Sequence, residues 1–131
     1  MKNLTIEWRH LDIEKDGVAS TCVRCNDTGE ELADVVKALS LECGLKGTEI
    51  SFKETKLAPS DVAQSNLVLF NGIPIEEVLP GAFASKNECQ SCCDLIGSQT
   101  DCRTIEYNGK TYETIPAELI RQAACAVAHC C

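Results

Sequence analysis

Cysteine is the residue type whose number and spacing point to chemistry in this sequence. The chain has 131 residues and ten cysteines, a content just below the level that marks a disulfide scaffold. The cysteines fall into four groups: a pair (Cys22 and Cys25), a quartet (Cys89, Cys92, Cys93 and Cys102), a C-terminal trio (Cys125, Cys130 and Cys131) and the single Cys43. The groups predict different roles, because cysteine acts as a nucleophile, as a soft metal ligand or as a small buried apolar residue.

The pair Cys22-Val-Arg-Cys25 has the C-x-x-C spacing that brings two sulfurs together across one turn. A helical pattern follows it, and a helix N-terminus lowers the pKa of a nearby thiol through its unpaired N–H groups and its dipole. Arg24 adds positive charge beside the pair. Thiol–disulfide exchange and soft metal binding both need thiolate, so Cys22 and Cys25 are candidate catalytic residues and candidate metal ligands. The structural alternative is two unreactive thiols in a loop.

The quartet can supply four sulfurs from one short segment. Four thiolates in tetrahedral geometry suit zinc, and a structural zinc ion would organise a segment that has no core of its own. An iron–sulfur cluster fits less well, because the spacing matches neither ferredoxin pattern. Two alternatives stay open: the adjacent Cys92 and Cys93 divide between metal binding and reaction, or the segment binds no ligand.

The remaining cysteines are weaker candidates for metal binding. His129-Cys130-Cys131 ends the chain, and a terminal Cys-Cys can pass a soft ion to another site. We favour the structural alternative, in which Cys130 packs as a small hydrophobe. Cys125 falls on the side of the final helix opposite its apolar face, and Cys43 is expected in the core. His10 ends the first predicted strand and is close enough in sequence to approach the pair, although a lone histidine is more often structural.

Charge and hydropathy exclude several classes of function. The formal net charge of −8 repels phosphate backbones and anionic lipid, so we expect neither nucleic acid nor a membrane surface as a partner. Secretory and membrane-spanning segments are not evident, since the longest apolar run is only Leu67–Phe70. These features predict a cytoplasmic protein with reduced thiols.

Local patterns predict the elements that position these thiols. Alternation predicts strands near 4–8 and 50–57, and Asn-Gly turns predict hairpins over 67–75 and 103–114. The capping-box spacing of Thr28 and Glu31 predicts a helix from there to Gly44, and Pro116 opens a final helix. Residues 17–26 and 81–102 are expected as loops, with one helical turn in 59–64. We therefore predict a single α/β domain over residues 1–131, with a thioredoxin-like mixed sheet, flanking helices and a cysteine-rich insertion at about 83–102.

Four blocks of the sequence resemble, in order, one prokaryotic family, the domain-of-unknown-function family 2703, which is thought to be thioredoxin-like. The blocks are Leu4–Asp12 (LTIEWRHLD), Cys22–Glu30 (CVRCNDTGE), Leu67–Glu76 (LVLFNGIPIE) and Cys102–Tyr112 (CRTIEYNGKTY). The resemblance implies the fold and the importance of Cys22, Cys25, Cys92, Cys93 and Cys102, but no established activity.

Two departures from active thioredoxins bear on the choice of function. The predicted helix starts after Cys25 instead of enclosing it. Active thioredoxins also resemble one another in a cis-proline before the third strand, where this chain has Ser65-Asn66. Both departures favour metal binding over disulfide exchange.

We therefore expect a thiol-based protein that binds or handles a soft metal or metalloid, such as zinc, copper(I), mercury or arsenite. The expected ligands are Cys22, Cys25, Cys89, Cys92, Cys93 and Cys102, with Cys125, Cys130 and Cys131 less favoured. One alternative is a thiol–disulfide oxidoreductase that acts on a protein partner, with Cys22 as nucleophile and Cys25 as resolving thiol. The other is a non-catalytic binding module in which the quartet is a structural metal clip.

Overall fold

The computed structural model describes residues 2–11, 13–15, 18–20, 23–58, 66–88 and 101–130. The predicted helical turn within 59–64 lies outside these residues, as do Cys22, Cys89, Cys92, Cys93 and Cys131. Cys25 and Cys102 belong to elements whose backbone is described.

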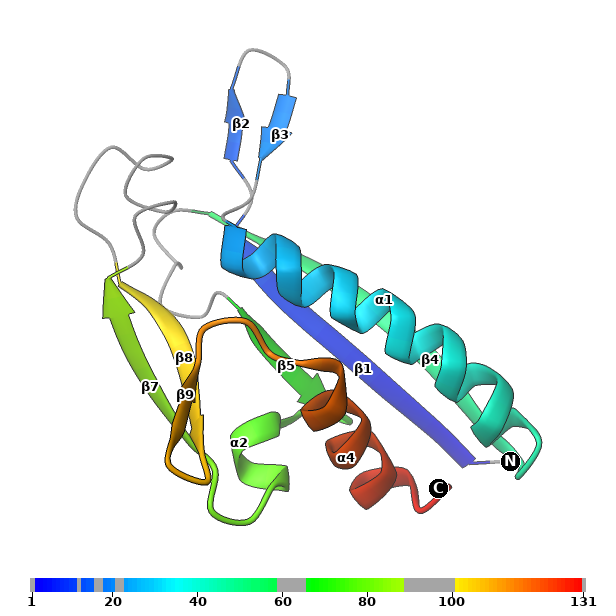
Figure 1. The fold of residues 1–131 in the computed structure, drawn as a ribbon. Coiled ribbons are helices and arrows are strands. Elements are labelled where there is room, and N and C mark those ends of the chain that lie inside the picture. Colours follow the sequence, from blue (N-terminus) through cyan, green and yellow to red (C-terminus); the bar gives the residue numbers. More distant parts are fainter. Residues whose placement is uncertain are drawn as a thin grey trace.

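The central sheet has four strands in the order β4-β1-β5-β6 (Figure 1). These strands are β1 (Lys2–Leu11), β4 (Thr48–Leu57), β5 (Leu67–Phe70) and β6 (Ile73–Pro74). β4 runs parallel to β1, whereas β5 runs antiparallel to β1 and β6 antiparallel to β5. Positive φ angles at Asn71 and Gly72 close the β5–β6 hairpin. The structure thus confirms the predicted first and second strands and the first hairpin.

Helix α1 (Val23–Gly44) makes the crossover between the parallel strands β1 and β4. The predicted start at a Thr28 capping box is wrong, because the helix begins at Val23 and continues through Thr28. Thr28 is fully buried, and its hydroxyl accepts a hydrogen bond from the backbone N–H of Ile115 at 3.1 Å. A tertiary contact therefore uses the side chain that the local pattern assigned to a cap.

Between β1 and α1 the sequence predicts a loop that begins at residue 17. The structure instead places a short hairpin there, formed by β2 (Ile13–Lys15) and β3 (Val18–Ser20). Three-residue strands carry too few side chains to display a period of two in the sequence.

Helix α4 (Ala117–Ala128) lies beside α1 on the same face of the central sheet (Figure 1). Pro116 is its N-cap, and His129, with a positive φ of 55°, ends it. The core lies between this helix layer and the sheet, and its fully buried side chains include Leu4, Ile6, Leu39, Phe70 and Ile120. The apolar face predicted for the final helix is confirmed, since Leu119, Ile120 and Ala123 are buried.

A second sheet is built from β7 (Phe83–Glu88), β8 (Asp101–Tyr107) and β9 (Lys110–Tyr112). The predicted hairpin through Asn108-Gly109 is confirmed as β8–β9. The expectation of a loop from residue 81 is wrong for residues 83–88, which pair with β8. β7 is an edge strand with Phe83 57% exposed, so its sequence lacks the alternation that burial imposes.

The short helix α2 (Ile75–Val78) connects the two sheets. Its Glu76 forms an ion pair with Arg103 of β8, and both side chains are largely buried. Within the residues that the structure describes, no helix is long and apolar enough to cross a membrane.

Candidate thiol site

Helix α1 begins at the residue that follows Cys22 in the sequence, and Cys25 is its third residue. The helix therefore encloses the second cysteine of the C-x-x-C motif, contrary to our expectation from the sequence. The first turn of a helix presents N–H groups without intrahelical partners and the positive end of the helix dipole. In general a helix N-terminus stabilises a nearby thiolate, which both candidate chemistries need.

The strand beneath α1 fixes what lies under this first turn. Trp8 of β1 packs so closely on Gly29 that a Cβ at residue 29 would lie 2.5 Å from Cη2 of the indole. Gly29 is four residues, or about 6 Å, from Cys25 along the helix, and His10 is two residues, or about 6.6 Å, beyond Trp8 along the strand. Since α1 runs antiparallel to β1 (Figure 1), both steps lead toward the end of the fold at which α1 begins.

His10 is 4% exposed, and its ring stacks on the indole of Trp8 with centroids 4.0 Å apart. Its Nε2 lies 2.6 Å from Oε1 of Glu54, a carboxylate on the neighbouring strand β4. The sequence placed this histidine at the end of the first strand, and the structure adds its burial and its carboxylate partner. Glu54 was not singled out, because only the β1–β4 register brings it to His10.

Asn66 is a second polar residue buried at this end of the core. The pairing of β1 with β5 ends at Arg9 and Leu67, and Asn66 is the residue before Leu67. Asn66 is 2% exposed with a φ of 58°, and its Nδ2 donates to the carbonyl of Glu113 at 2.7 Å. Its Oδ1 has no hydrogen-bond partner among the described residues. Its place before an apolar strand marks a turn in the sequence, but nothing local indicates its burial.

The strand ends that lead to the cysteine quartet lie at the same end of the fold. Figure 1 shows the end of β7, the start of β8 and the first turn of α1 on the side of the view away from the two chain termini. Cys102 is the second residue of β8 and pairs with Asn87. The other three quartet cysteines lie outside the described residues. In the part of the chain that is described, no group of three or more histidine, cysteine or acidic residues could hold a metal ion.

The opposite end of the fold carries a disulfide between Cys43 and Cys130, whose Cα atoms are 5.2 Å apart. Both residues are buried, which confirms the predicted burial of Cys43, but the sequence did not predict the bond. Cys125 is disulfide-bonded as well. The sulfurs of Cys43, Cys125 and Cys130 are therefore not thiolates in this structure, although the sequence predicts reduced thiols. The prediction of Cys125 and Cys130 as less favoured metal ligands applies to the reduced protein.

The outward face of β1 carries a separate ion network. Burial by itself raises the pKa of the Glu7 carboxyl. Hydrogen bonds from Arg9 at 2.9 Å and from Thr55 at 2.8 Å, together with the positive charges of Arg9 and Lys53, lower the pKa by more than burial raises it. The net pKa of Glu7 is lowered. Along a strand, residues 7 and 9 face away from residues 8 and 10, so this network is separated from the thiol site by the sheet.

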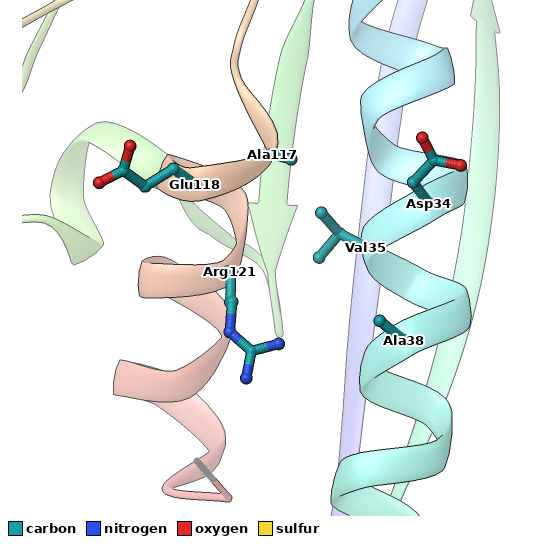
Figure 2. Close-up of a pocket in the computed structure, with 6 residues that line it drawn as sticks. All are labelled: Asp34, Val35, Ala38, Ala117, Glu118 and Arg121. Carbon is teal, nitrogen blue, oxygen red and sulfur yellow. The ribbon is translucent and has the colours of Figure 1, made fainter.

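A groove of about 250 Å³ runs between α1 and α4. Figure 2 shows its lining, which is Asp34, Val35 and Ala38 from α1 and Ala117, Glu118 and Arg121 from α4. Arg121 also forms an ion pair with Glu42 at 2.7 Å. These side chains provide neither a nucleophile nor a soft ligand, so the groove is not a candidate for thiol chemistry.

The comparisons with known proteins agree with the resemblance seen in the sequence blocks. The family model described as "Domain of unknown function (DUF2703)" matches residues 4–124. An uncharacterised protein of Archaeoglobus fulgidus is 35% identical over 121 residues, which cover 89% of this chain and 82% of that protein. No solved structure matches the chain.

Proposed function

The chain belongs to the family described as "Domain of unknown function (DUF2703)", and for this member we propose the binding or handling of a soft metal or metalloid ion by clustered cysteines. Cys22 and Cys25 form the centre of the proposed site. The observation that carries the proposal is the start of α1 at Val23, which sets the motif at a helix N-terminus. Two thiolates held in this way form a chelating pair for a soft ion.

The arrangement of elements supports a thioredoxin-like fold. A parallel pair of strands joined by α1 is followed by two antiparallel strands and then by α4, with the sheet order β4-β1-β5-β6. Thioredoxin-like proteins share this order, and they place their thiol pair where the first helix begins. The position of Cys25 within α1 is therefore the one that such a fold uses for chemistry.

The segment before β5 supports ion binding over disulfide exchange. Active thioredoxins resemble one another in a cis-proline at this place, whereas this chain has Asn66 with a positive φ, and no cis peptide bond occurs among the described residues. Without that proline, the backbone platform that aligns a substrate disulfide is missing. A thiolate pair without this platform can still capture an ion.

The quartet extends the proposed site. Because β7 ends and β8 begins at the end of the fold where α1 starts (Figure 1), Cys89, Cys92, Cys93 and Cys102 are proposed as further ligands, for zinc or another soft metal. If a structural metal clip were the whole function, a chelator would unfold the protein and leave the reactivity of Cys22 unchanged.

Thiol–disulfide exchange is the second candidate, and the enclosure of Cys25 by α1 favours it. In this reaction the Cys22 thiolate attacks a disulfide of a protein partner and releases one partner thiol. The thiolate of Cys25 then attacks the mixed disulfide, so that the partner is reduced and the pair is oxidised. A Cys22→Ser variant that reduces a model disulfide at the unchanged rate would exclude this role.

Ion binding is tested on protein purified without oxygen, by elemental analysis, thiol titration and calorimetry with arsenite and cadmium. We expect binding tighter than about 1 µM that is lost in a Cys22→Ser/Cys25→Ser variant. A Cys43→Ala/Cys130→Ala variant is the matched control, because it removes two cysteines from the other end of the fold and should bind normally. Absence of sub-micromolar binding, or equal binding by both variants, would refute the proposal. A cytoplasmic location is part of this proposal, and reduced Cys22 and Cys25 in cell extracts would support it.

A further inference from the structure

Strand β4 forms a ten-residue edge of the central sheet. Among the described residues it pairs with β1 alone, so every second residue of β4 directs its backbone N–H and C=O away from the sheet. Glu49, Phe52 and Lys53 are exposed, and Ile50 and Ser51 are half-buried. Phe52 keeps 42% of its surface in contact with solvent. A long edge with an exposed aromatic side chain is a template for pairing with another strand.

The side chains of β4 divide between the two faces of the sheet. Ile50 and Phe52 are in register with buried core residues of β1, so they lie on the face that the helices cover. Glu49, Ser51 and Lys53 lie on the opposite face. If a two-fold axis perpendicular to the sheet joins two copies at this edge, the strands pair antiparallel and each face continues into the second copy. Opposite residues must then share a face, which requires the axis to pass through a residue position of β4.

One position of the axis matches both faces. An axis at Ser51 sets Glu49 opposite Lys53 of the second copy and Ile50 opposite Phe52 of the second copy, and symmetry repeats each pair. An axis at Ile50 or Phe52 pairs neither Glu49 nor Lys53 with an opposite charge. An axis at Lys53 sets two lysines against each other. The charges and the apolar side chains therefore select the same register.

We propose that β4 is the interface of a homodimer, in which two copies of this chain join their central sheets edge to edge with the two-fold axis at Ser51. The four strands of each copy then form one continuous sheet, with the two β4 strands side by side at its centre. The occupant is a second copy because the strand is complementary to itself, which is what a two-fold interface requires. This inference does not depend on the proposed thiol chemistry.

The helix layer leaves room for this pairing. Helix α4 contacts β1 and β5, so the flank of α1 opposite α4 faces the free edge of β4. Asp34 and Ala38 line the groove toward α4 (Figure 2), whereas Val36, Ser40 and Gly44 recur at intervals of four on the other flank. Ser40 and Gly44 are exposed, and a Cβ at Gly44 would meet no described heavy atom within 4 Å. Small side chains on this flank allow the α1 helices of two copies to approach each other.

Sedimentation equilibrium on the full chain tests the proposal, after a non-reducing gel has verified that no disulfide links two copies. We expect the mass of two chains. Glu49→Lys sets lysine opposite Lys53 of the second copy at two places, so it should raise the dissociation constant of the dimer by about tenfold or more. Glu49→Lys/Lys53→Glu restores opposite charges only in the register centred on Ser51. It should return the dissociation constant to within about threefold of the wild type.

Glu77→Lys is the matched control, because it makes the same change of charge on α2, next to the opposite edge of the sheet at β6, and should leave the dimer unchanged. Hydrogen exchange is an independent measurement: the amides of residues 48–54 should exchange more slowly in the wild-type dimer than in Glu49→Lys. A wild-type chain that sediments as a monomer would overturn the proposal. A dimer that Glu49→Lys does not weaken, a double variant that dimerises no better than Glu49→Lys, or equal weakening by Glu77→Lys would overturn it as well.

Discussion

The disulfide between Cys43 and Cys130 joins the last turn of α1 to the segment after α4, and a Cys43→Ala/Cys130→Ala variant measures what that bond contributes. The two residues are 87 positions apart in the sequence. A cross-link that closes a loop of this length lowers the entropy of the unfolded chain by an amount worth about 4.5 kcal/mol at 25 °C. With an unfolding entropy of roughly 0.28 kcal/mol/K for a chain of this size, the melting temperature should fall by about 16 °C.

The assay is urea unfolding followed by far-ultraviolet circular dichroism, with and without a reductant. Mass spectrometry of peptides from the unreduced wild type first verifies that Cys43 and Cys130 are linked. The variant should lose stability without reductant, and the difference from wild type should shrink to about 1 kcal/mol or less when reductant opens the bond in the unfolded chain. Ion binding at the other end of the fold should be unchanged.

Two results would refute this reasoning. A loss below about 1 kcal/mol without reductant, in protein shown to carry the bond, would mean that the unfolded chain is already restricted by other means. A large loss that persists in reductant would mean that the packing of the two buried sulfurs, and not loop closure, supplies the stability.

Three further predictions concern α1 and β1. Gly29→Ala should cost about 1–3 kcal/mol in urea unfolding although alanine is the better helix former, because its Cβ would lie 2.5 Å from Cη2 of Trp8. Gly44→Ala is its control, since no described heavy atom lies within 4 Å of the new Cβ, and equal stability of the two variants would contradict the packing. Thr28→Val should lower the free energy of unfolding by about 1–3 kcal/mol, because it leaves the buried N–H of Ile115 unpaired. Thr28→Ser keeps the hydroxyl and is the control. Equal losses of stability in the two variants would show that this hydrogen bond contributes nothing. Glu7→Gln should reduce stability at pH 7, because the pKa of Glu7 is lower in the folded than in the unfolded chain. The stabilisation by ionised Glu7 is present above the pKa of the unfolded chain and is lost as the pH falls through the pKa of the folded chain. The stability difference between Glu7→Gln and wild type should therefore fade below about pH 4. A stability difference that does not vary with pH would contradict the lowered pKa of Glu7.

Several elements were predictable because their signals are local. Alternation in Leu4, Ile6 and Trp8 reflects one buried face of β1, and the Asn-Gly turns fix both hairpins through residues that tolerate a positive φ. The C-x-x-C motif and its place before a helical pattern identified the candidate thiol pair before any tertiary contact was known.

Other features depend on contacts between distant segments. The predicted start of α1 is wrong because Thr28, whose spacing from Glu31 is typical of a helix cap, instead accepts a hydrogen bond from Ile115, 87 residues away. Strand β7 was missed because an exposed edge strand has no buried face to impose a pattern. Cysteine spacing likewise did not reveal that Cys43 and Cys130 meet.

The sequence by itself determined that this protein is rich in thiols, where its last helix and its main strands lie, and that a C-x-x-C pair lies close to the start of its first helix. The tertiary structure decided that α1 carries Cys25 near its start and, near its end, the disulfide from Cys43 to Cys130. It also decided that His10 and Asn66 are buried. The physical reason is that periodicity and turn chemistry act over a few residues, whereas strand register and helix packing bring together groups whose separation along the chain carries no signal.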